Sequence, residues 1–331
     1  MTYDDSWDRP HTPVDTALWQ ESDCYWFYDE AAGIGGFHRI GQKPAQGTGQ
    51  ATLFVFKRGA ERFVLSDGDA TEFDIRSGDR REHGQSVGGH VVESLGGGRM
   101  RYGAETPDCS LDLEFHESFY EPRDWSMSGH SDEFMQSINS QGHLECSGRI
   151  RGTVRIGQET HDVSALAHRD RSWGIRDHAR VSLHRYRMFS GTVGPELSFA
   201  SFLLDVKDGP AMCAGFVVRN GVQEDVRKLR VITTTDHDGL TPLAARAILT
   251  LERGDEIEVN ATPVQGFLTP LRDIGCATQD HISTITHSGL RGFADLEFCN
   301  NPGRGTYIPT QDDVTFLAVD QGLSRSVDYD L

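Results

Sequence analysis

Hydrophobic and polar residues alternate with a period of two along most of the chain, the pattern typical of half-buried β-strands. In Cys109–His116, for example, Leu111, Leu113 and Phe115 fall on one face, and the charged residues fall on the other. Comparable segments recur in both halves of the sequence: 51–57, 61–65, 148–156, 160–166, 197–204, 212–218, 226–233, 245–251, 256–261 and 292–298. Many short strands separated by glycine-containing turns predict an all-β protein built of barrels or sandwiches.

Turn and helix signals agree with this prediction. Arg58–Ala60 contains a glycine between two strand patterns, and Asn220-Gly221 is the strongest short hairpin signal in the chain. Helical periodicity is scarce and is confined to two short segments, 13–20 after Thr12 and 132–138 after Ser131. We therefore expect antiparallel sheets with few short helices.

The length of the chain, 331 residues, exceeds what one hydrophobic core normally serves. Strand patterns are equally dense before residue 165 and after residue 185, and each half is long enough for a barrel of about eight strands. We therefore predict two domains, residues 1–172 and 173–331. The stretch between them is the most densely charged of the sequence, which is unlike a flexible linker. We expect a packed interface there, formed by Arg169, Arg171, Arg176 and Asp177.

The charge balance narrows the range of partners. The chain has 50 Asp and Glu against 32 Lys and Arg, a formal net charge of −18, and the acidic residues are spread along its whole length. This distribution disfavours nucleic acid and anionic membranes as partners. The N-terminus has no secretory signal pattern, and the longest apolar run, residues 211–218, is too short to span a bilayer. We expect a cytoplasmic protein without an integral membrane segment; the sequence leaves a homodimer open.

Three short segments resemble a known family. Cys24–Asp29 (CYWFYD), Gly142–Glu145 (GHLE) and above all His168–Gly174 (HRDRSWG) are similar to the tandem lipocalin-like proteins. That family includes the relatives of carotenoid 1,2-hydratase (hydroxyneurosporene synthase) and the AttH-like and kievitone-hydratase-like proteins. The resemblance implies two calyx-like β-barrels packed together, with an apolar ligand pocket. It also implies the addition of water to, or its removal from, a C=C bond, or the guided cyclisation of terpenoid and polyketide substrates.

Several common catalytic motifs are absent from the sequence. It contains no G-x-S-x-G elbow, no Walker loop and no H-E-x-x-H or C-x-x-C pattern, and Gly33–His38 lacks the third glycine of a dinucleotide fingerprint. The nearest metal-like grouping combines His161 and Asp162 with His168 and Asp170, but spacing alone is a weak signal. We therefore expect neither a metal nor a cofactor.

The remaining chemistry is proton transfer. Strand alternation places His168, Asp170 and Ser172 on one face, and it places His143 and Glu145 together on another strand. His168 is the better proton-transfer candidate because histidine titrates near neutral pH, whereas arginines beside Asp170 favour an ion pair. His143 and Glu145 could act as acid and base. The structural alternatives are an ion-pair network, a buried structural histidine and a solvated strand face.

The aromatic run Tyr25–Tyr28 predicts either core packing or a pocket wall, and Tyr28 adds a hydroxyl to the catalytic candidates. The residues expected to contact substrate are Trp26, Phe115, Trp173, His184 and Tyr186. We predict a cofactor-independent hydratase or dehydratase, isomerase or cyclase that acts on a hydrophobic small molecule, such as a terpenoid, steroid or polyketide, in a barrel cavity. The alternatives are a non-catalytic carrier of a hydrophobic ligand and a carbohydrate-binding β protein.

Overall fold

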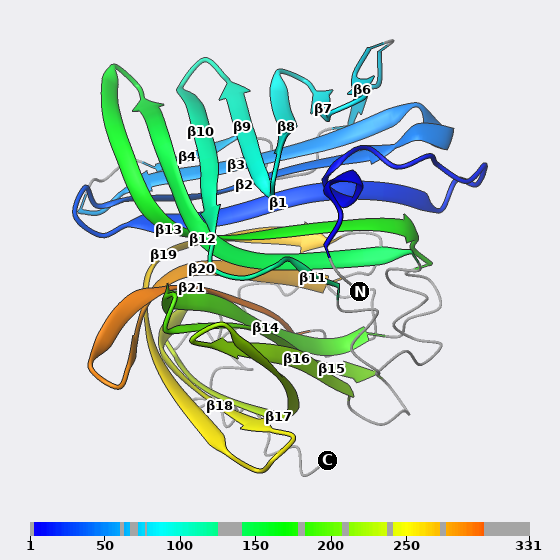
Figure 1. The fold of residues 1–331 in the computed structure, drawn as a ribbon. Helices are drawn as coiled ribbons and strands as arrows, with labels where there is room; N and C mark the ends of the chain where they lie inside the picture. Colours follow the sequence, from blue (N-terminus) through cyan, green and yellow to red (C-terminus); the bar gives the residue numbers. More distant parts are fainter. Residues whose placement is uncertain are drawn as a thin grey trace. The chain divides into compact units, whose positions relative to one another are not determined.

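The computed structural model describes residues 3–59, 63–66, 72–76, 78–124, 141–177, 183–206, 212–236, 241–271 and 276–300. The chain divides into two compact units, Met1–Asp177 and His178–Leu331, and each is built of antiparallel strands (Figure 1). The predicted all-β, two-unit fold is confirmed. The expected boundary after residue 172 falls inside a strand of the first unit that continues to Ile175.

Helices are scarce among the described residues, as expected, but one predicted helix is wrong. Only two short 3₁₀ turns are present in this part of the chain, η1 (Asp5–Asp8) and η2 (Pro44–Gln46). Residues 13–18 form no helix, and Val14 and Leu18 are exposed. Since these two apolar side chains are exposed, a helix there would gain little from packing. The other predicted helix, 132–138, lies outside the described residues.

The first unit is a 13-stranded sheet whose main path follows the order β4-β3-β2-β1-β13-β12-β10-β9-β8-β7-β6, while β5 pairs with β3 and β11 with β12. Over the described residues this path has two free ends, so the sheet curls without closing. The strands are β1 (Trp19–Asp29), β2 (Ile34–Lys43), β3 (Thr48–Lys57), β4 (Phe63–Ser66), β5 (Glu72–Asp74), β6 (Arg80–Arg81), β7 (Gly84–Val87), β8 (His90–Gly96), β9 (Arg99–Glu105), β10 (Cys109–Ser118), β11 (Arg123–Asp124), β12 (Gly142–Ile156) and β13 (Glu159–Ile175).

Side chains from distant strands meet inside the curl. The rings of Tyr25 on β1 and Tyr102 on β9 lie 4.0 Å apart between centroids, and His38 on β2 contacts His90 on β8 through a 3.0 Å hydrogen bond. All four side chains are buried. The curl therefore gives the central strands β1 and β13 two different environments, one on the concave face and one on the opposite face.

The second unit is a closed barrel of eight strands in sequential order. Its strands are β14 (Leu183–Gly194), β15 (Leu197–Val206), β16 (Met212–Arg219), β17 (Val222–Thr235), β18 (Pro242–Leu251), β19 (Glu256–Leu271), β20 (Cys276–His287) and β21 (Leu290–Asn300). One continuous cluster of buried apolar side chains, including Phe189, Phe199, Leu249 and Leu296, forms its core. Closure removes the free sheet edges of this unit.

Close packing at one glycine gives a first testable prediction. A Cβ atom at Gly142 would lie 2.2 Å from the Trp173 ring, so no side chain fits without moving the indole. We expect Gly142→Ala to destabilise the first unit by about 1–3 kcal/mol, as overpacking does. Urea unfolding followed by tryptophan fluorescence measures the change. Gly103→Ala is the control, because its Cβ would meet no atom closer than 3.8 Å; an equal effect of the two substitutions would contradict the packing argument.

Candidate functional site

The candidate site lies on one face of four adjacent strands, β12, β13, β1 and β2. The register aligns their polar residues in rows: Glu145 is opposite Asp170, Asp170 is opposite Cys24, and Cys24 is opposite Arg39. The next row contains Ser147, His168, Trp26 and Phe37. Cross-strand partners project to the same side of a sheet, so residues from four separate segments meet on this face.

His143 contacts two carboxylates at the centre of this face. Its Nε2 atom forms a short ion pair with Asp170 and lies 3.4 Å from Oε1 of Glu145. The backbone N–H of His143 donates to Asp124 at 3.2 Å, which holds this end of β12. The side chains of His143 and Asp170 are 12% and 10% exposed, whereas that of Glu145 is fully buried. A small molecule could therefore reach His143 and Asp170 more readily than Glu145.

His168 lies behind this pair and is completely buried. One ring nitrogen, Nε2, contacts Glu145 in a short ion pair, and the other, Nδ1, lies 2.8 Å from the hydroxyl of Ser147. Ser147 is itself held by Tyr120, whose hydroxyl accepts a 2.9 Å hydrogen bond from the Ser147 N–H. Because both ring nitrogens are engaged, the orientation of His168 is fixed, and with it that of Glu145.

The charges of the central pair follow from these contacts. Burial lowers the pKa of His143, but Asp170 and then Glu145 outweigh burial and raise it from 6.5 to about 10. Burial raises the pKa of Asp170, but His143 and then Arg176 outweigh it, so that this pKa lies below its ordinary value. At neutral pH the pair is therefore an imidazolium beside a carboxylate, which combines a proton donor with a proton acceptor.

This pair makes stability depend on pH. A histidine whose pKa is raised in the folded state stabilises the fold fully below its unfolded pKa and loses that contribution as pH rises through the folded pKa. We therefore expect the difference in Tm between the wild-type protein and His143→Gln to shrink as pH rises from 6.5 to about 10. Thermal unfolding across this pH range measures it. His161→Gln removes a histidine of the neighbouring strand β13 and is the control; a pH-independent difference for His143→Gln would contradict the ion pair.

Aromatic residues lie beside the charged cluster on the same face. The Trp26 ring is 6.3 Å from that of His168 and 5.1 Å from that of Phe37. Tyr28 follows two positions along β1, and its ring lies 6.0 Å from Phe56. Trp26 and Tyr28 are almost completely buried. This face thus combines an apolar area with a pair able to exchange protons.

Among the residues that the structure describes, two groups of side chains have donor atoms close enough to hold a cation. In the first unit His143, Glu145 and Asp170 place one ligand atom each within 4.8 Å of one another, and a metal there would have to displace the proton of His143. The grouping expected from the sequence is not the one formed, because His161 and His168 are an odd number of residues apart on β13 and project to opposite faces. His161 lies 3.5 Å from Glu159 instead.

In the second unit Asp280, Asp295 and Glu297 form a comparable acidic group. Burial and then Glu297 raise the pKa of Asp280 well above its ordinary value. Tyr186, expected to contact substrate, donates to Glu297 in a short hydrogen bond and lies 3.1 Å from the hydroxyl of Thr278. The side chain of His184 lies outside the described residues.

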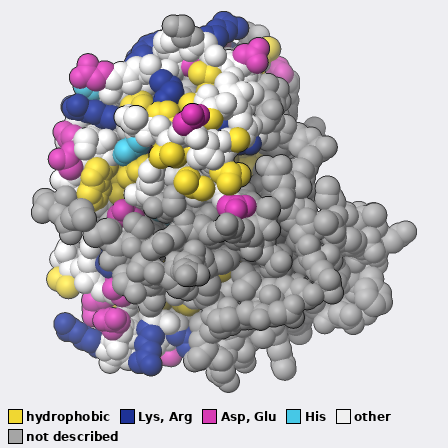
Figure 2. All heavy atoms as spheres, turned by 90° about the vertical axis from the view of Figure 1, so that its right-hand side faces the viewer, with side chains coloured by type: hydrophobic (Ala, Val, Ile, Leu, Met, Phe, Trp, Pro, Cys, Tyr) yellow, Lys and Arg dark blue, Asp and Glu magenta, His cyan; other side chains and the backbone are white. Residues whose placement is uncertain are grey.

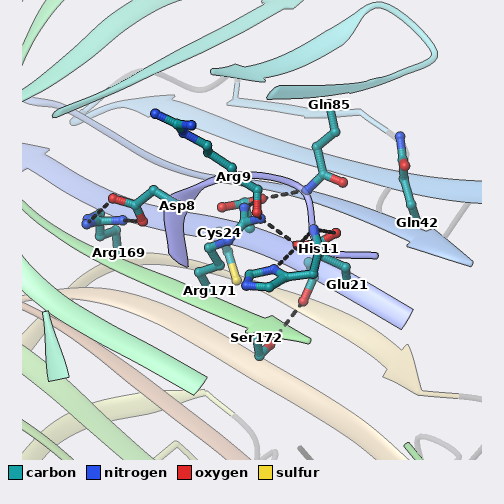
Figure 3. A network of polar contacts seen from close by, with 12 residues as sticks. Asp8, Arg9, His11, Glu21, Cys24, Gln42, Gln85, Arg169, Arg171 and Ser172 are labelled. Atoms are coloured by element: carbon teal, nitrogen blue, oxygen red, sulfur yellow. Dashed lines mark hydrogen bonds and ion pairs between the residues drawn. The ribbon is translucent and has the colours of Figure 1, made fainter. Parts of the chain in front are cut away.

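The arginines of the conspicuous RDRSWG segment project to the concave face, away from Asp170. Figure 3 shows Arg169 beside Asp8, with which it forms a two-pronged ion pair, at 2.6 and 3.0 Å. Arg171 pairs with Asp23 and Glu21. All these carboxylates belong to the first unit, and all of these side chains are almost fully buried. The described contacts of both arginines therefore stabilise the first unit; a role for them between domains stays a prediction.

Phe115 and Trp173 also belong to the concave face. Phe115 lies under the guanidinium of Arg169, 5.5 Å from the ring centroid, and Trp173 stacks on His11 at 3.8 Å. Neither ring has a described contact with His143 or Asp170. The structure thus brings His143, Glu145, His168 and Asp170 together and places Trp26 beside them, with Tyr28 further along β1.

Sequence reasoning missed several residues of the candidate site. Ser147 follows His143 and Glu145 at the same two-residue spacing, so strand alternation was a signal for it. Cys24, whose thiol lies 3.7 Å from Asp170, was a member of the aromatic segment but carried no signal of its own. Arg39 and Tyr120 come from distant strands or turns, and only the fold brings them here.

The fold defines a class of β proteins in which two curled or closed antiparallel sheets follow one another along the chain. The structure is similar to an AttH-type protein from Nitrosomonas europaea (TM-score 0.61, 15% identity, 86% of this chain and 94% of the other covered). It is also similar to kievitone hydratase from Nectria haematococca (TM-score 0.57, 8% identity, 88% of this chain and 96% of the other covered). A third similar structure is CghA in complex with Sch210972 (TM-score 0.56, 11% identity, 89% of this chain and 94% of the other covered). These similarities confirm the fold expected from the three sequence motifs.

At the level of sequence, the model of the domain of unknown function DUF7064 matches residues 4–302, and the chain belongs to that family. No curated protein sequence matches the chain. Within the described part of the structure, no helix is long and apolar enough to cross a membrane.

Proposed function

We propose that this protein is a hydratase or dehydratase, or an isomerase or cyclase, that acts by proton transfer on a small hydrophobic molecule. The observation that supports the proposal is the buried pair of His143 and Asp170, held by Glu145 and His168 beside Trp26. The names of two structural neighbours, a hydratase and CghA with a small molecule bound, agree with it.

In the hydration direction, the imidazolium of His143 gives its proton to one carbon of a C=C bond, and Asp170 takes a proton from the water that adds to the other carbon. The carboxylic acid of Asp170 then returns its proton to His143 across the ion pair, which restores the starting state. The same steps in reverse eliminate water. In an isomerisation or a proton-triggered cyclisation the pair moves a proton between carbons without adding water.

Glu145 and His168 act as positioning residues in this proposal. Glu145 contacts both histidines, and its complete burial keeps it from bulk water. His168, locked by Ser147, prevents Glu145 from rotating away. An arrangement that holds reacting groups at hydrogen-bond distance before substrate arrives lowers the entropic part of the reaction's barrier.

The two alternative functions lack comparable support. A carbohydrate-binding surface would need exposed aromatic platforms, and no aromatic ring is among the exposed large hydrophobic side chains of the described residues. A passive carrier needs no proton donor beside a proton acceptor, whereas His143 and Asp170 form such a pair next to the apolar Trp26. Figure 2 shows basic and acidic side chains interspersed on the described part of the face in view.

The proposal is tested by incubating the protein with a small-molecule extract of its own host in H₂O and in D₂O, followed by mass spectrometry. The expected result is a compound that gains or loses one water, or one that takes up deuterium at carbon without a change of formula. Asp170→Asn is the negative control. Finding a compound that co-purifies unchanged and exchanges no carbon-bound hydrogen would favour the carrier instead.

A further inference from the structure

Two arginines on the face of the candidate site have no carboxylate of their own. Arg39, half-buried on β2, forms no hydrogen bond or ion pair with any described residue. Arg176, just after β13, bonds only hydroxyl groups: its Nη2 forms a short hydrogen bond with Ser172 and lies 3.3 Å from Ser22. Its Nε atom is buried without a hydrogen-bond partner. Arginines buried in this way normally pair with an anion.

The two guanidinium groups lie close together. A Cβ atom on Gly41 would lie 3.1 Å from the guanidinium of Arg39, so the Arg39 side chain extends along its strand over Gly41. The cross-strand neighbour of Gly41 is Ser22, the residue that Arg176 contacts. Burial and then the charge of Arg39 lower the pKa of Arg176 to about 10, and Asp170 compensates only in part. Two like charges are thus held together without an intervening anion.

Charged side chains are close together on this part of the face. Between the rows of Ser22 and Trp26, the positive groups of His143, Arg39 and Arg176 face the negative groups of Glu145 and Asp170. Neither arginine forms an ion pair with one of these carboxylates. Because position 41 is a glycine, the guanidinium of Arg39 can lie directly over the backbone there, next to the strand that carries Ser22.

We propose that Arg39 and Arg176 bind one anionic oxygen group, a carboxylate or an enolate, of an otherwise hydrophobic substrate. For the reaction itself, this inference rests on the proposed function; what it adds is the substrate class. The substrate would be an acid whose apolar part lies toward Trp26 and Phe37, with its reacting carbon beside His143 and Asp170. A guanidinium pair recognises such a group by charge and by paired N–H donors. With a carbonyl-conjugated substrate, the same arginines would stabilise the negative charge that develops on oxygen during proton transfer.

The test measures binding without turnover. Isothermal titration at neutral pH compares 2-naphthoate with its neutral, similarly shaped amide, 2-naphthamide. The wild-type protein is expected to bind the carboxylate at least about tenfold more tightly than the amide. Arg39→Gln and Arg176→Gln should each reduce this preference severalfold. Arg81→Gln removes an exposed arginine of β6 and should leave the preference unchanged.

Two results would overturn the proposal: equal binding of the two probes by the wild-type protein, including no binding of either, or a preference that survives in Arg39→Gln. Arg39 is the decisive position because it is half-buried and has no described partner, so its substitution should not disturb folding; circular dichroism checks this. A preference for the carboxylate without any proton transfer in the D₂O experiment would refute the proposed enzyme but support the acid-binding site. Proton transfer without a preference for the carboxylate would refute the acid-binding site but support the proposed enzyme.

Discussion

Asp170→Asn is expected to lower turnover by about 10²–10⁴-fold, the range that a positioned acid–base group contributes. Asparagine has nearly the same shape, but it can neither accept a proton nor balance the charge of His143. Asp170 is the largest favourable contributor to the raised pKa of His143. The substitution should therefore also bring the pKa of His143 down, which NMR titration of the imidazole measures independently of any substrate.

His143→Gln should produce a loss of similar size, because it removes the other member of the pair. The rate of water addition or deuterium uptake, once the host extract provides a reactive compound, measures both variants. His161→Gln, on the neighbouring strand β13, is the matched control and should retain full activity. If His143→Gln and Asp170→Asn fold normally and turn over at the wild-type rate, the assignment of the acid–base pair is wrong.

The second large effect concerns stability and the opposite face of the sheet. Asp8→Ala should destabilise the first unit by about 3–5 kcal/mol, because it leaves the buried guanidinium of Arg169 without its partner. Both side chains are almost fully buried, so water cannot replace the lost carboxylate. All five tryptophans precede residue 178, so urea unfolding followed by their fluorescence reports on this unit.

A surface ion pair provides the comparison. Lys57 and Glu159 are 2.9 Å apart, but their side chains are 42% and 67% exposed. Lys57→Met should therefore change the free energy of unfolding by less than about 1 kcal/mol. Replacing Asp8 and Arg169 together by apolar residues of similar volume should recover much of the loss caused by Asp8→Ala. Equal effects of Asp8→Ala and Lys57→Met would show that the concave-face pair does not stabilise the fold as we infer.

Local pattern explains why the fold could be predicted from the sequence. The alternation in Cys109–His116 recurs as the buried and exposed positions of β10, and Asn220-Gly221 forms the turn between β16 and β17. The predicted helix over residues 13–20 failed because helical spacing in so short a segment needs a surface to pack on, and Val14 and Leu18 have none. The closing of one sheet and not the other depends on pairing between remote strands, which no local pattern specifies.

The sequence by itself determined which side chains share a strand face, because side-chain direction alternates strictly along a strand. It thereby grouped His168 with Asp170 and His143 with Glu145. Only the tertiary structure decided that β12 and β13 pair with Glu145 opposite Asp170, and that β1 and β2 add Trp26 and Arg39. It also decided that Arg169 and Arg171 project to the concave face, to Asp8, Glu21 and Asp23. Register between strands more than a hundred residues apart results from the packing of the whole sheet, so the site could be anticipated in its parts but not in its assembly.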